Sequence, residues 1–189
     1  DFGKKCDFDK VAESWELSCH KDGSSILKNG PDAGKTLREY LDAHGTGFLG
    51  TNCAGCTTVP VLIKLIDAKQ DLSIQVHPDD DYAMRAEGEP GKTEMWYIVD
   101  AAPGAALYYG VKQTVSKEEF ARRIQEQTLP EILNRVEVTA GELYFIPSGT
   151  LHAIGAGILL AEIQQNSNTT YRVYDYGRRG ADGKLRPLH

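Results

Sequence analysis

The 189-residue sequence lacks a long apolar run, has few cysteines, and carries fewer positive than negative charges. No apolar stretch approaches the length of a transmembrane helix, so we expect no membrane partner. Lys and Arg number 21 against 27 Asp and Glu, and the formal net charge of −6 disfavours a general nucleic-acid binder. We also find no signal peptide, internal repeat or low-complexity tract.

The four cysteines, Cys6, Cys19, Cys53 and Cys56, are too sparse for a disulfide scaffold. This favours a reducing compartment. Cys53 and Cys56 form a lone CxxC in a loop rich in Gly and Thr. A structural zinc knuckle would need Cys6 and Cys19 as further ligands at an unusual spacing. We therefore favour the alternative, free thiols on a loop.

Dense turn signals and short apolar runs are typical of an all-β fold. Hydrophobic residues make up 41% of the sequence and charged residues 25%, as in an ordinary globular protein of this size. Strands are predicted at residues 15–18, 61–67, 72–77, 94–100, 105–109, 137–138, 142–146, 158–165 and 171–175.

Helices are few. Thr36 to Glu39 has the form of a capping box and opens a helix that ends near Ala43. Residues 79–86 form a second helix with an acidic start, and Ser116 to Glu119 is another capping box that heads residues 120–127. One more helical turn is expected at 130–134. Strands interrupted by a helical insert at 116–134 predict a jelly-roll β-barrel.

Polar side chains share one face of the strand expected at residues 72–77. Gln75 and His77 point to the same side because strand side chains alternate, and Ser73 joins them. Buried polar groups cost free energy unless they are satisfied. A metal ion would satisfy the glutamine oxygen and the imidazole nitrogen together.

Two further clusters extend this pattern. Glu94 begins a strong strand, with Lys92 on the same face two residues earlier. Gly141-(x5)-Pro147-x-Gly149-x2-His152 matches the second motif of the cupin fold. There, a tight Pro/Gly turn leads into a strand that presents one histidine into the barrel mouth. Ala156 stands where an asparagine often follows.

Gln75, His77, Glu94 and His152 together form a set of nitrogen and oxygen ligands. Imidazole suits zinc, iron, copper or nickel, and a single carboxylate without thiolate favours zinc with one open position. Either histidine alone could be an ordinary strand or loop residue. The combination within the Gly-Pro-Gly-His frame predicts a metal site.

Long ordered segments carry a resemblance to a known family. They are residues 60–67, 72–79, 92–97, 149–153 and 165–175, with 13–18 fitting an early strand. The sequence resembles type I mannose-6-phosphate isomerase, particularly the compact bacterial form, over nearly its whole length. Members interconvert mannose 6-phosphate and fructose 6-phosphate, mostly in the cytoplasm.

The resemblance implies roles for individual residues. One zinc ion per chain would be bound by Gln75, His77, Glu94 and His152. Arg172 and Lys92 match catalytic positions, and Ser73 and Lys64 match positions assigned to the substrate phosphate.

Physical chemistry supports several of these roles. A cation such as Arg172 can stabilise negative charge that develops when a carbonyl moves between C1 and C2, and Lys64 and Lys92 can bind a phosphate. The base is left unassigned, because Lys92 qualifies only if its pKa is lowered.

The sequence also departs from the family. It begins after the usual opening strand and ends, at 186–189, where a second β-barrel normally follows. We therefore expect one cupin domain over residues 1–189, truncated or unusually short. The loop 46–58 has no counterpart that we can map. Two alternatives are an iron-dependent cupin oxygenase and a non-catalytic cupin that binds sugar phosphates. The oligomeric state is not indicated.

Overall fold

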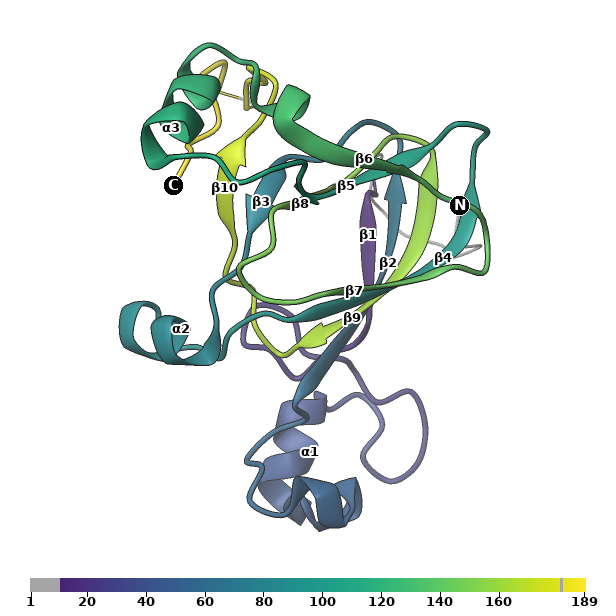
Figure 1. The fold of residues 1–189 in the computed structure, drawn as a ribbon. Helices are drawn as coiled ribbons and strands as arrows, with labels where there is room; N and C mark the ends of the chain where they lie inside the picture. Colours follow the sequence, from purple (N-terminus) through teal and green to yellow (C-terminus); the bar gives the residue numbers. More distant parts are fainter. Residues whose placement is uncertain (1–10, 181) are drawn as a thin grey trace.

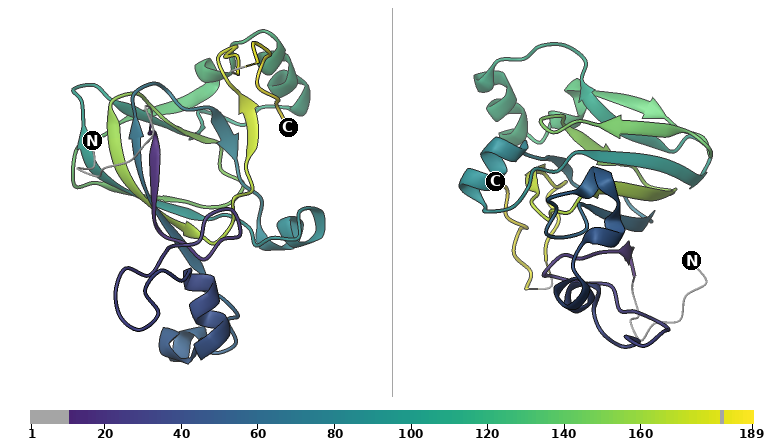
Figure 2. Two further views of the ribbon diagram at one scale, coloured as in Figure 1. Left: turned by 180° about the vertical axis from the view of Figure 1, so that it is seen from behind. Right: turned by 90° about the horizontal axis from the view of Figure 1, so that it is seen from below.

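Two five-stranded antiparallel sheets face each other in the computed structural model, which describes residues 11–180 and 182–189 (Figures 1 and 2). The first sheet contains, in spatial order, β1 (Glu13–Leu17), β2 (Val61–Ala68), β9 (Ile158–Gln165), β4 (Glu94–Ala101) and β7 (Leu143–Ile146). The second contains β10 (Tyr171–Tyr174), β3 (Ile74–Val76), β8 (His152–Ile154), β5 (Ala106–Val111) and β6 (Leu133–Glu137). Spatial order differs from chain order, as in a jelly roll.

Alternating burial along the long strands builds the core between the sheets. Every second residue of β2 and β9 is buried, which leaves the intervening side chains on the outer face. Trp96, Ile98, Leu107 and Leu160 are fully enclosed in the main cluster. The prediction of an all-β, cupin-type jelly roll is confirmed. In the described residues the two sheets stay separate and are not hydrogen-bonded into one closed barrel.

The helices lie close to where the sequence predicts, although the one expected at 120–127 spans Lys117–Gln125. In α1 (Leu37–His44), the Thr36 hydroxyl accepts from the Glu39 N–H, and the Glu39 carboxylate accepts from the Thr36 N–H, so that capping box is complete. Asp79 caps α2 (Asp80–Ala86). Ser116 caps α3 (Lys117–Gln125), but the carboxylate of Glu119 pairs with Arg122 and Arg123. The second box is therefore only half formed.

The helical turn expected at 130–134 is present as a 3-10 helix over Leu129–Ile132, but it ends earlier than predicted. The strand β6 already begins at Leu133, within the expected range. The reason is tertiary, since Leu133 is fully buried and pairs with Val111 of β5. Of the strand expected at 137–138, Glu137 is thus the last residue of the longer β6, and Val138 lies just beyond it.

The loop 46–58 contains short 3-10 helices at Gly47–Leu49 and Thr51–Cys53, and extends with α1 from one end of the sheets (Figure 1). Cys19, Cys53 and Cys56 are free thiols, as favoured, while Cys6 lies outside the described residues. None of the described helices has both the length and the apolar character needed to cross a membrane.

Candidate metal centre and active-site cavity

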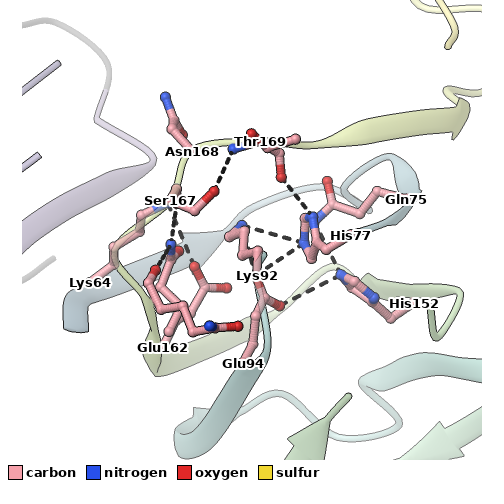
Figure 3. A network of polar contacts seen from close by, with 12 residues as sticks. Lys64, Gln75, His77, Lys92, Glu94, His152, Glu162, Ser167, Asn168 and Thr169 are labelled. Carbon is pink, nitrogen blue, oxygen red and sulfur yellow. Dashed lines mark hydrogen bonds and ion pairs between the residues drawn. The ribbon is translucent and has the colours of Figure 1, made fainter. Parts of the chain in front are cut away.

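Strands from both sheets bring the predicted metal ligands together. His77 directly follows β3, and His152 begins β8, where it pairs in register with Gln75 of β3. Glu94 begins β4 in the other sheet. One ligand atom each of His77, Glu94 and His152 lies within 4.8 Å of the others, and all three residues are buried (Figure 3).

Backbone carbonyls fix the orientation of both imidazoles. The Nδ1 of His77 lies 3.0 Å from the Thr169 oxygen, and the Nδ1 of His152 lies 2.8 Å from the Thr150 oxygen. A carbonyl can only accept, so each Nδ1 carries the proton and each Nε2 presents a lone pair. Burial lowers the pKa of His77 and lowers that of His152 to about 4, which keeps both rings neutral, as metal ligands must be.

The Glu94 carboxylate faces both Nε2 atoms. Its oxygens lie 3.1 Å from that of His77 and 3.6 Å from that of His152. Burial alone would raise the pKa of Glu94, but the Lys92 ammonium, 2.7 Å from Oε1, and the two histidines hold it well below its usual value. The Lys92 ammonium thus balances the charge of this buried carboxylate. Together with the two imidazole Nε2 atoms that it faces, the carboxylate offers a set of donors that fits a divalent cation.

Gln75 completes the predicted ligand set. Its side-chain Nε2 lies 3.3 Å from Nε2 of His152, so the amide is already beside the two imidazoles. A half-turn of the amide exchanges Nε2 for Oε1 and presents an oxygen to the same point. Two imidazoles, one carboxylate and one amide oxygen are donors that suit a divalent transition metal.

A cavity of about 460 Å³ opens beside this cluster. Gln75 and Lys92 line the cavity and contact the histidines and Glu94, so they form the boundary between the cavity and the metal ligands. The other predicted site residues, Lys64, Ser73 and Arg172, also line it. The volume falls in the range of about 300–1,000 Å³ that is usual for small-molecule sites.

Arg172 reaches the cavity from β10, where it pairs in register with Gln75. Its Nη1 donates to the carbonyl of Pro187 at 3.1 Å, whereas its buried Nε has no hydrogen-bond partner among the described residues. Arg172 therefore keeps donor capacity for a ligand.

The role of Lys92 as the catalytic base stays a prediction. Burial lowers its pKa, but the carboxylates of Glu94 and Glu162 outweigh that effect and raise it above the usual value. These protein groups favour the charged form of Lys92, a buried ammonium 2.7 Å from Glu94 Oε1.

Glu162 is the functional candidate that our sequence analysis missed. It lies opposite Lys64 across β2 and β9, accepts a hydrogen bond from the Trp96 indole at 2.9 Å, and lines the cavity. Burial, reinforced by the negative charge of Glu94, raises its pKa. A signal existed, since Glu162 is a charged residue in phase with the buried Ile158 and Leu160.

Comparisons with known proteins point to one family. Residues 6–104 match the family model for the catalytic domain of phosphomannose isomerase type I. The chain is 46% identical over 190 residues to mannose-6-phosphate isomerase ManA of Bacillus subtilis and 42% identical to mannose-6-phosphate isomerase of Streptococcus mutans. All of the chain is covered in both alignments, and it spans 59% and 58% of the length of these relatives.

A solved structure agrees with these matches. The crystal structure of mannose 6-phosphate isomerase from Bacillus subtilis matches with a TM-score of 0.91 and 44% identity, over all of this chain and 59% of that one. The family match covers more than half of the chain and includes Gln75, His77 and Glu94. The chain belongs to the type I phosphomannose isomerase family.

Proposed function

We propose that the chain interconverts mannose 6-phosphate and fructose 6-phosphate with one zinc ion bound by Gln75, His77, Glu94 and His152. The observation that carries this proposal is the pair of buried imidazoles whose Nε2 atoms face Glu94 beside a cavity lined by basic residues. The relatives at 46% and 42% identity are named mannose-6-phosphate isomerase, and the chain spans 59% and 58% of their length.

The ligand chemistry supports zinc. The set contains two neutral imidazoles and one carboxylate without thiolate, which is typical of catalytic zinc sites. When bound, zinc supplies a Lewis acid that polarises the substrate carbonyl. The hydrogen bonds that the two Nδ1 atoms donate to the carbonyls of Thr169 and Thr150 keep both ligand rings in the required orientation.

The reaction requires two hydrogen transfers. From the aldose, the hydrogen on C2 leaves as a proton and one returns to C1, while the hydroxyl proton of O2 passes to O1. Negative charge develops on the oxygens in between. The protonated Lys92 and the guanidinium of Arg172 line the cavity and stabilise that charge.

Glu162 is the group best suited to move the proton between C1 and C2. It is a buried carboxylate whose pKa is raised, whereas the pKa of Glu94 is depressed. Such divergence separates a proton-transferring group from a ligand. Lys64, 3.6 Å away, and the Trp96 indole hold the carboxylate at the cavity wall.

The substrate phosphate would bind at the same cavity. Ser73 and Lys64, the positions suggested by the family resemblance, both line it. Ser73 is a buried hydroxyl, and Lys64 is a buried ammonium. Both are hydrogen-bond donors that suit a phosphate group.

The test is conversion of mannose 6-phosphate to fructose 6-phosphate by the purified chain, before and after chelation and after zinc is restored. We expect turnover that is lost with the metal and regained with zinc. Binding of the sugar phosphate without turnover would instead support a non-catalytic cupin. Bound iron with oxygen consumption would support an oxygenase.

A further inference from the structure

Three arginines gather at one part of the cavity wall: Arg172, Arg178 and Arg186. Arg172 belongs to β10, and the other two lie on the segment that follows it. This segment folds back, because Arg186 N–H donates to the Arg178 carbonyl and His189 N–H donates to the Arg172 carbonyl. The return of the chain therefore places Arg186 beside residues that precede it by eight and fourteen positions.

Among the described residues, the ion pairs of the arginine cluster do not balance its positive charge. Asp175 is the carboxylate that pairs with it, with Arg178 and, at 3.4 Å, with Arg186. Three positive charges and one negative charge leave a net charge of +2. The pKa of Arg172 is lowered by burial and by the positive charges of Arg186 and Arg178. A phosphomonoester, with a charge of about −1.5 to −2 at neutral pH, would complement this excess.

The three guanidinium groups differ in how far they are already engaged. Arg178 binds the Asp175 carboxylate through two nitrogens and donates to the Asp71 carbonyl at 2.7 Å. Arg172 donates to Pro187. Among the described residues, the guanidinium of Arg186 has only the 3.4 Å ion pair from its Nε to Asp175. Its terminal nitrogens are therefore the cluster's most available donors for a ligand.

Lys64 is in a different situation. Its ammonium lies 3.6 Å from Glu162 and 3.9 Å from Glu13, and it also lies 5.1 Å from the ring centre of Trp15. Its charge is already shared between two carboxylates, which limits what it can add to the binding of a phosphate dianion.

We propose that Arg186 recognises the phosphate of the substrate and sets the preference for a phosphorylated over an unphosphorylated sugar. This inference rests on the proposed function and adds a specificity residue to the same cavity. Two nitrogens of a guanidinium match two oxygens of a phosphate, an arrangement that a lysine cannot reproduce. Because the phosphate is remote from the reacting carbons, Arg186 would act on binding more than on the chemical step.

The experiment compares Arg186→Gln with wild type and with Lys184→Gln. Lys184 is an exposed cation on the same returning segment and does not line the cavity. Lys184→Gln therefore changes the net charge by the same amount as Arg186→Gln. We measure kcat and KM for mannose 6-phosphate and for mannose, and the Kd of inorganic phosphate by calorimetry. Thermal unfolding checks that each variant folds.

We expect Arg186→Gln to raise KM for mannose 6-phosphate and Kd for phosphate by roughly 10- to 100-fold, with kcat nearly unchanged. Activity on mannose should not change, and Lys184→Gln should behave as wild type. Arg186→Lys, which keeps the charge, should give intermediate values of this KM and Kd. It replaces Arg186→Gln in the comparison if that variant does not fold. Equal losses for both sugars, or wild-type phosphate affinity in Arg186→Gln, would overturn the inference.

The phosphate titration separates this inference from the proposed function. A wild-type chain that binds phosphate through Arg186 but does not isomerise the sugar would contradict the activity and leave the phosphate site standing. A chain that isomerises mannose 6-phosphate equally well with Gln at position 186 would contradict only the phosphate site.

Discussion

At the scale of single residues, the contacts of their Nδ1 atoms identify His77 and His152 as candidate metal ligands. Each donates to a backbone carbonyl and leaves Nε2 free for a metal. We expect His152→Ala to weaken zinc binding by at least about 100-fold, since a direct ligand should matter no less than the groups that orient it. Elemental analysis after dialysis measures this. His44→Ala is the control, because His44 is exposed and pairs with Asp32. Wild-type metal content in His152→Ala would refute the assignment.

Replacing Arg172 should reduce turnover without changing the amount of bound metal. Its guanidinium lines the cavity and lies outside the cluster of His77, Glu94 and His152. We expect Arg172→Ala to retain zinc and to lose roughly 10²- to 10³-fold in kcat, the usual cost of removing one donor that stabilises developing charge. Steady-state kinetics together with metal analysis tests both halves. A wild-type kcat would exclude the role.

The raised pKa of Glu162 predicts how the activity depends on pH. A base must be deprotonated to accept a proton, and burial raises the pKa of Glu162 above that of an ordinary glutamate. The kcat/KM of the wild type should therefore fall as pH decreases through this raised pKa, beginning above the usual value of 4.5. Glu162→Gln should remove most turnover at every pH, whereas Glu162→Asp should keep part of it. An unchanged pH profile in Glu162→Gln would assign the proton transfer to another group.

At the scale of elements, the position of Lys92 depends on the close approach of the Gly91 backbone to the start of α2. A Cβ added to Gly91 would lie 2.6 Å from the backbone of both Asp79 and Asp80, at the start of α2. Such contacts require the backbone to shift, and Lys92 is the next residue. We expect Gly91→Ala to cost about 1–3 kcal/mol in the free energy of unfolding and to reduce kcat. Gly47→Ala is the control, because its Cβ would meet nothing within 4 Å. Equal stability of the two variants would contradict the packing argument.

The elements show what the sequence alone could establish. Alternation in β2 and β9 and the cap at Thr36 were predictable because they depend on neighbouring residues. The start of β6 was not, since tertiary pairing buries Leu133 in a segment whose local signals favour a helical turn.

The residues of the candidate site also divide into those that the sequence could identify and those that it could not. The ligand residues stood out by chemical type, and the resemblance added Arg172, whereas the carbonyls of Thr150 and Thr169 have no sequence signal because every residue has one. Arg186 enters the cavity only through the return of the chain after β10.

At the scale of the whole molecule, the site is a junction between the two sheets. Glu94 and Glu162 belong to the first sheet, whereas Gln75 and His152 belong to the second. The site therefore requires both sheets to be packed together, because its ligands are separated by up to 77 positions in the sequence. A metal bound by both sheets would hold them in that arrangement.

Metal removal should consequently lower the stability of the whole chain. A ligand that binds only the folded state adds about 4 kcal/mol at a free concentration 1,000-fold above its Kd. For a chain of this length that corresponds to a rise in Tm of about 10 °C. We expect a chelator to lower the Tm of the zinc-loaded protein by this order, and zinc to restore it. Magnesium should not, because it prefers a shell of oxygen ligands. His152→Ala should show little response to either treatment. A wild-type Tm that stays constant while elemental analysis shows zinc leaving would mean that the metal does not join the sheets.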